Sequence, residues 1–168
     1  MISVINHDEA MTRLRAPADK VWILRIPGIG RDATARKLLR LAVLTLAKAW
    51  HGPGVVLNEN SNLPVLVGAP WSLSISYDGL DGWVAWSASG AIGLDVEPIR
   101  TFPDMAEVSC QFLSAEDTFT SPIESPEVAF TRKWTTMEAR YKLECSGASR
   151  RARVDHLRVG NCMLTVAH

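Results

Sequence analysis

The sequence has few cysteines, no excess of charge and no long apolar run. Its three cysteines, Cys110, Cys145 and Cys162, are scattered and show no C-x-x-C spacing. This argues against a disulfide framework and a zinc site, and indicates a reducing compartment. The 18 basic residues balance the 18 acidic ones, so the chain as a whole shows no nucleic-acid-binding footprint. No apolar stretch approaches the roughly 18 residues of a membrane span, and no basic-then-apolar leader opens the chain. We therefore expect a soluble, cytoplasmic protein that binds neither nucleic acid nor membrane.

The sequence does contain enough apolar material for a folded core. Of its 168 residues, 47% are hydrophobic, which suffices for one compact domain or for two small halves that share a core. Neither a P-loop nor a dinucleotide-binding fingerprint is present. Strand and helix signals run in the order βαβββ and then ααββ, which predicts the α+β class. Residues 98–103 are the predicted linker, so the two halves span residues 1–98 and 99–168.

Capping residues set the bounds of the predicted helices. The two clearest helices begin after the N-caps Asp32 and Ser125 and end at Gly52 and Gly147. Each carries apolar residues at helical spacing, which predicts a face directed toward the core. A shorter helix is predicted at 104–110.

Short alternating runs predict the strands. The predicted strands span residues 20–26, 71–77, 83–87, 91–97, 154–159 and 162–166, with a loop at 58–69. The short connections within 71–97 favour an antiparallel meander. Such a meander would place Asp95 and Glu97 beside Ser76 and Tyr77.

The segment Gly93-Leu94-Asp95-Val96-Glu97 places two carboxylates in an apolar strand. Alternate residues of a strand point to the same face, so Asp95 and Glu97 project side by side. Two neighbouring anions repel unless a cation or a shared proton lies between them. Mg²⁺ binds carboxylate oxygens and keeps positions open for phosphate. The alternative is that the pair forms the solvated face of an edge strand.

The helix predicted at 126–145 carries a second charged motif. Trp134, Glu138 and Lys142 recur at every fourth residue and therefore lie on one stripe. Taken alone, the Glu–Lys pair is an ordinary surface stabiliser worth a few tenths of a kcal/mol. Trp134 likewise fits a packing face that has no active site.

Together the two motifs resemble the signatures of the 4′-phosphopantetheinyl transferases. These signatures are G-[apolar]-D-[apolar]-E and, about forty residues later, W-x-x-K-E-x-x-x-K, and they match residues 93–97 and 134–142. Further similarities are a helix ending R-x-L-L at 32–39, an [FL]-x-[IL]-S-H-S strand at 73–78, and an F-[FL]-S-x-x-E segment at 112–117. The first motif begins about ninety residues into the chain, which is similar to the longer, pseudo-dimeric type of the family.

The resemblance implies both a fold and an activity. The fold is α+β, with two similar halves that each contain a short antiparallel sheet and a long helix, and two such halves in one chain favour a monomer. Members of this family transfer the phosphopantetheine arm of coenzyme A to a serine of an acyl or peptidyl carrier protein. They depend on Mg²⁺, release adenosine 3′,5′-bisphosphate and serve fatty acid, polyketide or nonribosomal peptide biosynthesis.

The resemblance also implies catalytic roles for four side chains. Asp95, Glu97 and Glu138 are the expected Mg²⁺ ligands. Glu138, or Glu97 through a water molecule, is expected to accept the proton of the serine hydroxyl. Lys142 is expected to neutralise charge on the diphosphate or to protonate the leaving group.

At the nucleotide end, the resemblance implies contacts with coenzyme A. Arg36, together with Arg31, is expected to bind the 3′-phosphate. Ser76 lies where the family contacts the nucleotide. Tyr77 stands in the place of a histidine that touches the 3′-phosphate, and its phenol can donate a hydrogen bond but brings no charge.

Two further positions depart from the family pattern. Met137 stands in place of the lysine before the glutamate, and Leu63 in place of the lysine of a G-K-P segment. With Tyr77, these replacements predict weaker or altered binding of coenzyme A. Because all the expected metal ligands and Lys142 are present, the leading hypothesis is an active enzyme. The alternatives are a degenerate member that binds a carrier protein or nucleotide without turnover, and a structural α+β module.

Overall fold

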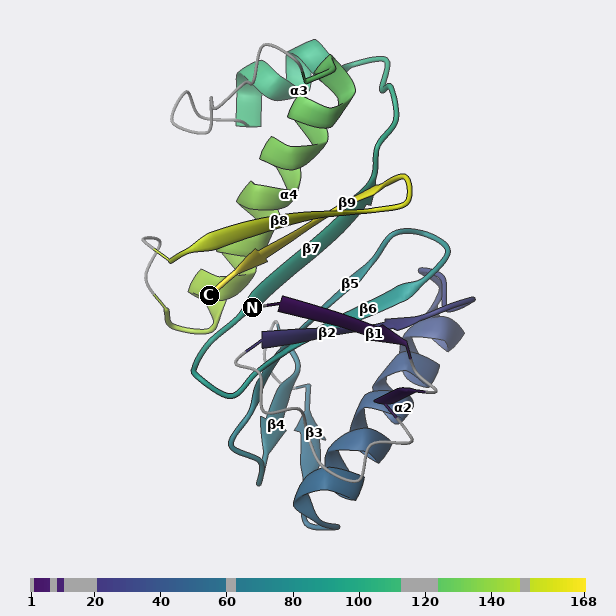
Figure 1. Ribbon diagram of the computed structural model, residues 1–168, viewed down its shortest axis with the longest axis vertical. Coiled ribbons are helices and arrows are strands. Elements are labelled where there is room, and N and C mark those ends of the chain that lie inside the picture. The colour runs from purple at the N-terminus through teal and green to yellow at the C-terminus, as the bar shows by residue number, and fades with distance from the viewer. Residues whose placement is uncertain (1, 7–8, 11–20, 60–62, 113–123, 149–151) are drawn as a thin grey trace.

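The computed structural model describes residues 2–6, 9–10, 21–59, 63–112, 124–148 and 152–168 (Figure 1). As predicted, the chain is of the α+β class, with small sheets and helices. The strands are β1 (Ile2–Asn6), β2 (Val21–Ile26), β3 (Val56–Asn58), β4 (Val65–Val67), β5 (Ser72–Tyr77), β6 (Gly82–Ser87), β7 (Gly93–Pro98), β8 (Val154–Val159) and β9 (Cys162–Ala167). The helices are α2 (Ala33–His51), α3 (Met105–Phe112) and α4 (Pro126–Cys145). Within the described ranges, each helix is too short or too polar to cross a membrane.

The same strand–helix–hairpin unit occurs twice. In the first half, β2 is followed by α2 and by the antiparallel pair β5–β6; in the second, β7 is followed by α4 and by the antiparallel pair β8–β9. The strand orders match as well, because β2-β6-β5 and β7-β9-β8 both place the last strand of the unit in the centre. The first sheet carries β1 in addition, parallel to β2. Each unit thus contains a small sheet and a long helix, and the first sheet is mixed because of β1.

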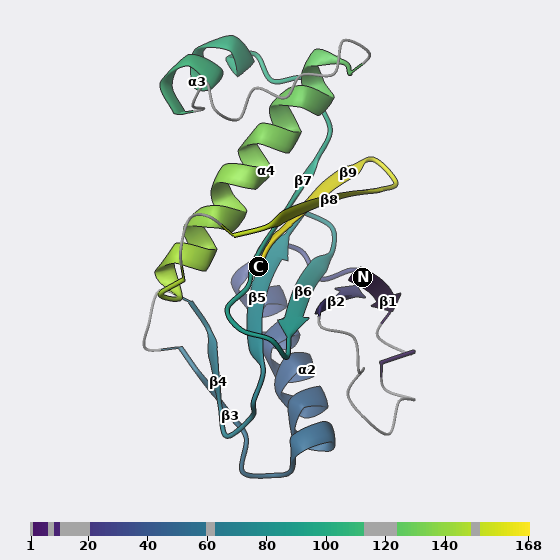
Figure 2. The same cartoon turned by 60° about the vertical axis from the view of Figure 1, so that its left-hand side comes forward.

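The two units stack in four layers, in the order α2, first sheet, second sheet and α4 (Figures 1 and 2). Alternate residues of β2 point to opposite faces, so Trp22 packs with Leu39 of α2 while Ile23 packs with Val96 of β7. Burial of these apolar side chains is the main source of stability. The two sheets therefore bury their inner faces against each other, and a helix covers each outer face.

The predicted meander is wrong in its last strand. β5 and β6 pair as expected, but β7 pairs with β9 instead of β6. β7 is an edge strand of its sheet and lies against β5. The two strands are joined there by hydrogen bonds from the backbone of β7 to side chains of β5, and not by backbone pairing. The amide nitrogens of Leu94 and Val96 donate to the hydroxyl oxygens of Ser74 and Ser76, at 3.0 and 3.2 Å. These serine hydroxyls satisfy the β7 amides that point away from β9, so β7 does not need a second backbone-paired strand on this edge.

The loop predicted at 58–69 contains part of a hairpin. β3 and β4 pair with Val56 opposite Val67, and Leu57 opposite Leu66. Both leucines pack against the first core, whereas the valines are exposed. Each strand has only three residues, and such short alternating runs carry too little signal to be separated from a loop.

The other predicted elements are confirmed. The carboxylate of Asp32 caps α2 by accepting hydrogen bonds from the amides of Thr34 and Ala35, and the hydroxyl of Ser125 caps α4. α3 and the closing hairpin β8–β9 also lie where the sequence places them. Residues 113–117, which complete the F-[FL]-S-x-x-E similarity, lie outside the described residues.

The expected division after residue 98 separates β7 from the strand with which it pairs. β7 precedes the division, yet its hydrogen-bonded neighbour β9 lies in the second half. By topology the second unit begins at Gly93, because β7 holds the place in its sheet that β2 holds in the first. Residues 99–104 then connect β7 to α3.

Candidate functional site

The alternation of β7 directs its acidic residues toward α4. Leu94 and Val96 point into the core between the sheets, so Gly93, Asp95 and Glu97 face the helix. At Gly93, a Cβ atom would lie 1.9 Å from the carbonyl oxygen of Ala139 on α4. The absence of a side chain therefore allows β7 and α4 to approach closely, and this contact sets the distance from Asp95 to the helix.

Asp95 is the centre of the candidate site, and only 5% of its surface is exposed. Its Oδ1 accepts hydrogen bonds from Ser76 Oγ at 3.0 Å and from Lys142 Nζ at 2.8 Å. The same ammonium donates to the carbonyl oxygen of Leu94 at 2.8 Å. In contrast, Asp95 Oδ2 is buried and has no hydrogen-bond partner among the residues that the structure describes. Half of this carboxylate is therefore satisfied and half is available to another donor or to a cation.

Glu97 lies at the end of β7 and is bound by an arginine of the first unit. Arg31 Nη2 donates to Glu97 Oε1 at 2.9 Å, and its guanidinium also donates to the carbonyl oxygen of Tyr77 at 2.8 and 3.1 Å. Burial raises the pKa of Glu97, Arg31 lowers it, and the charge of Asp95 raises it again, with a net upward shift. The carboxylate therefore holds its proton more strongly than an exposed glutamate.

Glu138 lies on α4, one turn before Lys142, as the sequence predicts. Burial raises the pKa of Glu138, the nearby charge of Asp95 raises it further, and Lys142 lowers it. The net shift is upward. Asp95 thus interacts electrostatically with both glutamates, and Lys142 is the cation closest to it.

The three acidic residues do not form a closed ligand set. In the part of the chain that the structure describes, no three histidine, cysteine, aspartate or glutamate side chains are gathered closely enough to hold a metal ion. Their chemistry nevertheless fits a hard divalent cation. Asp95 Oδ2 is a buried oxygen without a donor, and the raised pKa values of Glu97 and Glu138 reflect negative charge held away from water. A cation bound among them would give Asp95 Oδ2 a partner and would offset the negative charge of the two glutamates.

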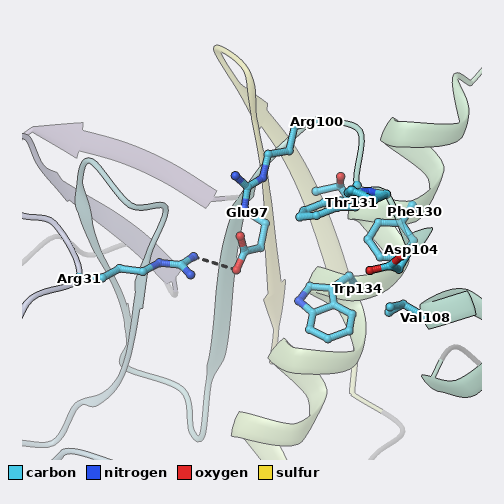
Figure 3. A pocket seen from close by; sticks show the side chains of 10 residues that line it. Arg31, Glu97, Arg100, Asp104, Val108, Phe130, Thr131 and Trp134 are labelled. Atoms are coloured by element: carbon cyan, nitrogen blue, oxygen red, sulfur yellow. Dashed lines mark hydrogen bonds and ion pairs between the residues drawn. The ribbon is translucent and has the colours of Figure 1, made fainter. Parts of the chain in front are cut away.

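A cavity of about 310 Å³ opens beside Glu97 (Figure 3). It lies between the end of β7, the 99–104 connection, α3 and α4 (Figure 3). Three of its charged side chains are Arg31, Glu97 and Arg100; its apolar walls are Phe102, Pro103, Val108, Phe130 and Trp134. The rings of Phe130 and Trp134 stack with centroids 6.3 Å apart. The cavity therefore has a charged side next to the carboxylates and an apolar interior.

Two arginines of α2, Arg36 and Arg40, interact with Tyr77. The guanidinium of Arg36 lies 5.8 Å from the centre of the Tyr77 ring. The Tyr77 hydroxyl is buried and, within the described ranges of the chain, has no hydrogen-bond partner. Burial raises the pKa of Tyr77, while Arg40 and Arg36 lower it, and the net shift is upward. The hydroxyl therefore stays protonated and can donate to an anion that binds beside these arginines.

Ser76 has a different role from the one expected at the nucleotide. It is buried, donates to Asp95 and accepts from the amide of Val96. Its hydroxyl thus orients the central carboxylate and joins β5 to β7. Sequence reasoning also missed the cavity residues Arg100 and Phe102, although their position just after the D-x-E motif was a usable signal.

Comparison with known proteins yields no relative: no protein-family model matches the chain, and no curated protein matches it. The resemblance to the transferases therefore rests on the motifs themselves. A function has to be argued from the residues of the site, their spacing and their surroundings.

Proposed function

We propose that this protein is a Mg²⁺-dependent transferase that moves the phosphopantetheine arm of coenzyme A to a serine of an acyl or peptidyl carrier protein. The observation that carries the proposal is the contact between the two sequence motifs. Asp95 and Lys142 lie 47 positions apart in the chain and meet at 2.8 Å. The charge of Asp95 acts on the pKa of Glu138 and of Glu97, and the charge of Lys142 acts on that of Glu138. Motifs that match only by chance have no reason to converge.

Asp95, Glu97 and Glu138 are the residues that would hold Mg²⁺ in this account. The ion supplies positive charge to the diphosphate of coenzyme A when bound. Asp95 Oδ2 is the oxygen best suited to contact it, because Oδ1 already accepts from Ser76 and Lys142. Ser76 keeps the Asp95 carboxylate in one orientation.

The transfer requires a base and a cation beside the leaving group. The serine oxygen of the carrier forms a bond to the phosphorus that bears the pantetheine arm, the bond from that phosphorus to the bridging oxygen breaks, and adenosine 3′,5′-bisphosphate leaves. Glu138 is the carboxylate that accepts the serine proton in this account. Lys142 offsets the charge that develops on the leaving phosphate.

The remaining features match the two ends of coenzyme A. Arg36 and the hydroxyl of Tyr77 offer a cation and an unused donor to the 3′-phosphate. The cavity beside Glu97 offers apolar walls for the uncharged arm, including Phe130 and Trp134. Arg31 bridges the two regions, because it contacts both Tyr77 and Glu97.

A second candidate is a member of the same family that binds without turnover. Lys142 is already paired with Asp95, and Met137 supplies no additional cation. In that case the carrier protein or nucleotide would bind, but no arm would be transferred.

The test is a transfer assay read by mass spectrometry. The full chain is incubated with coenzyme A, Mg²⁺ and each of several apo carrier proteins. We expect a gain of one phosphopantetheine on the carrier, abolished by a chelator and reduced about 100-fold or more in Asp95→Ala. If no carrier gains mass, the transferase is rejected. Carrier binding that persists in Glu138→Ala, with no turnover in either protein, supports the second candidate.

A further inference from the structure

The outer face of α2 carries two exposed leucines. Leu38 is 53% exposed and Leu41 is 61% exposed. Residues three positions apart lie on the same side of a helix, so the two side chains form one apolar patch. The buried face of α2, which includes Leu39, Val43 and Leu46, already covers the first sheet. The fold itself therefore gives no reason for leucine at either exposed position.

The charge of α2 has one sign. The helix contains Arg36, Lys37, Arg40 and Lys48 and no aspartate or glutamate, although the chain as a whole is balanced. Lys37 and Lys48 lie four positions before and seven positions after Leu41. At that spacing they follow the same stripe of the helix. The leucines are thus bordered by positive charge on an exposed surface.

The N-terminal end of α2 adjoins the candidate site. Arg36 lies over the ring of Tyr77. Arg31, just before the helix, donates to Glu97 at 2.9 Å. A protein that covers the first turns of α2 would therefore lie next to the groups assigned to coenzyme A and Mg²⁺.

We propose that the surface formed by Lys37, Leu38, Leu41 and Lys48, called the α2 patch, docks the carrier protein that supplies the acceptor serine. Its counterpart is a helix of the carrier that presents apolar side chains among carboxylates. The apolar centre gives affinity, and the charged border speeds association. This inference rests on the proposed function, because it identifies the surface that brings the acceptor to the site.

Two other occupants fit the patch less well. A second copy of the chain, related by a twofold axis, would bring two basic helices together, and their like charges repel. A membrane surface requires a broad apolar face on the helix. In α2 that face is buried against the sheet, which leaves only Leu38 and Leu41 exposed on this side.

The test separates carrier docking from coenzyme A binding. Initial transfer rates are measured while the concentration of an apo acyl carrier protein or of coenzyme A is varied. We expect Leu41→Glu to raise the KM for the carrier about tenfold or more and to leave the KM for coenzyme A unchanged. Lys37→Glu/Lys48→Glu should slow association at low salt and remove most of its salt dependence. The matched control is Val67→Glu, at a position on β4 that is 48% exposed, and it should behave as wild type.

Fluorescence anisotropy measures binding of the labelled apo carrier without transfer, so the α2 patch and the transferase activity can be tested separately. If wild type shows no transfer but binds the carrier, and Leu41→Glu weakens that binding, the α2 patch stands and the transferase fails. If Leu41→Glu binds and turns over the carrier as wild type does, the α2 patch is refuted while the transferase stands. Wild type that binds anionic vesicles but no carrier also refutes it. Circular dichroism verifies that each variant is folded.

Discussion

The carboxylate of Asp95 is buried between a serine of β5 and a lysine of α4, a setting in which a lone charge would be costly. Lys142 neutralises it at 2.8 Å, and Ser76 adds a second donor on the same oxygen. A purely structural ion pair gains from satisfying both carboxylate oxygens, but Oδ2 has no donor. The charge of Asp95 also raises the pKa of both Glu97 and Glu138, so the proposed cation site is the explanation that we test below.

The raised pKa of Glu138 leads to a prediction about stability and pH. A carboxyl group with a raised pKa binds more protons in the folded than in the unfolded state, so the folded state loses stability as pH rises from near the ordinary value of 4.5 through the raised pKa. Glu138→Gln removes this dependence. In metal-free buffer, the free energy of unfolding of the variant minus that of wild type should increase over this range, as measured by urea titration.

An exposed glutamate provides the matched control. Glu107 on α3 is solvent-exposed and accepts a hydrogen bond from Gln111, so Glu107→Gln should keep the pH profile of wild type. A Glu138→Gln profile parallel to that of wild type would contradict the burial of this carboxylate beside Asp95.

At the scale of single residues, the sequence indicated the charged side chains of the candidate site more clearly than it indicated their hydrogen-bond partners. Spacing places Asp95 on one strand face and Glu138 on one helix stripe, but both were singled out by the resemblance of their two motifs to the transferase signatures. The sequence placed Asp95 beside Ser76 through a meander that the structure does not have; the bond between them depends on how β7 crosses β5. Neither residue type nor local period contains that information.

At the scale of elements, the contact between β7 and α4 holds the site together. In Gly93→Ala the new Cβ atom would meet the carbonyl oxygen of Ala139 at 1.9 Å, and a backbone group cannot rotate out of the way. We expect a loss of about 3 kcal/mol in the free energy of unfolding. Because the strand and helix would separate, we also expect weaker binding of coenzyme A with Mg²⁺. Urea unfolding and calorimetry measure the two effects.

Gly54 supplies the control for this substitution. A Cβ atom there meets nothing within 4 Å, and the backbone is not in the left-handed region. Gly54→Ala should therefore change neither stability nor binding by a measurable amount. Equal effects at Gly54 and Gly93 would show that glycine as a residue type, and not the approach of β7 to α4, determines the result.

The helices were predictable as elements because their ends carry explicit signals. Asp32 and Ser125 are N-caps in the sequence and in the structure. The partner of β7 was not predictable in the same way. An apolar run of six residues fits the edge of either sheet equally well, and the choice of β9 is made by packing against α4 and by the serines of β5.

At the scale of the whole molecule, the candidate site lies where the two repeated units meet. The first unit supplies Ser76, Tyr77 and Arg31, and the second supplies Asp95 and Lys142. The second unit thus holds the carboxylates and Lys142, whereas Arg31 and the Ser76 hydroxyl that contact those carboxylates come from the first. Side chains spread over more than a hundred residues of the chain, from Arg31 to Lys142, therefore lie around one region.

The central claim is that Asp95, Glu97 and Glu138 converge on one divalent cation when coenzyme A binds. The most direct measurement is a crystal structure of the complex with coenzyme A and Mn²⁺, with the metal located by its anomalous scattering. The account predicts a single metal peak in contact with Asp95 Oδ2, both glutamates and the diphosphate. A diphosphate bound elsewhere, or bound beside Lys142 with no metal peak at these carboxylates, would contradict it.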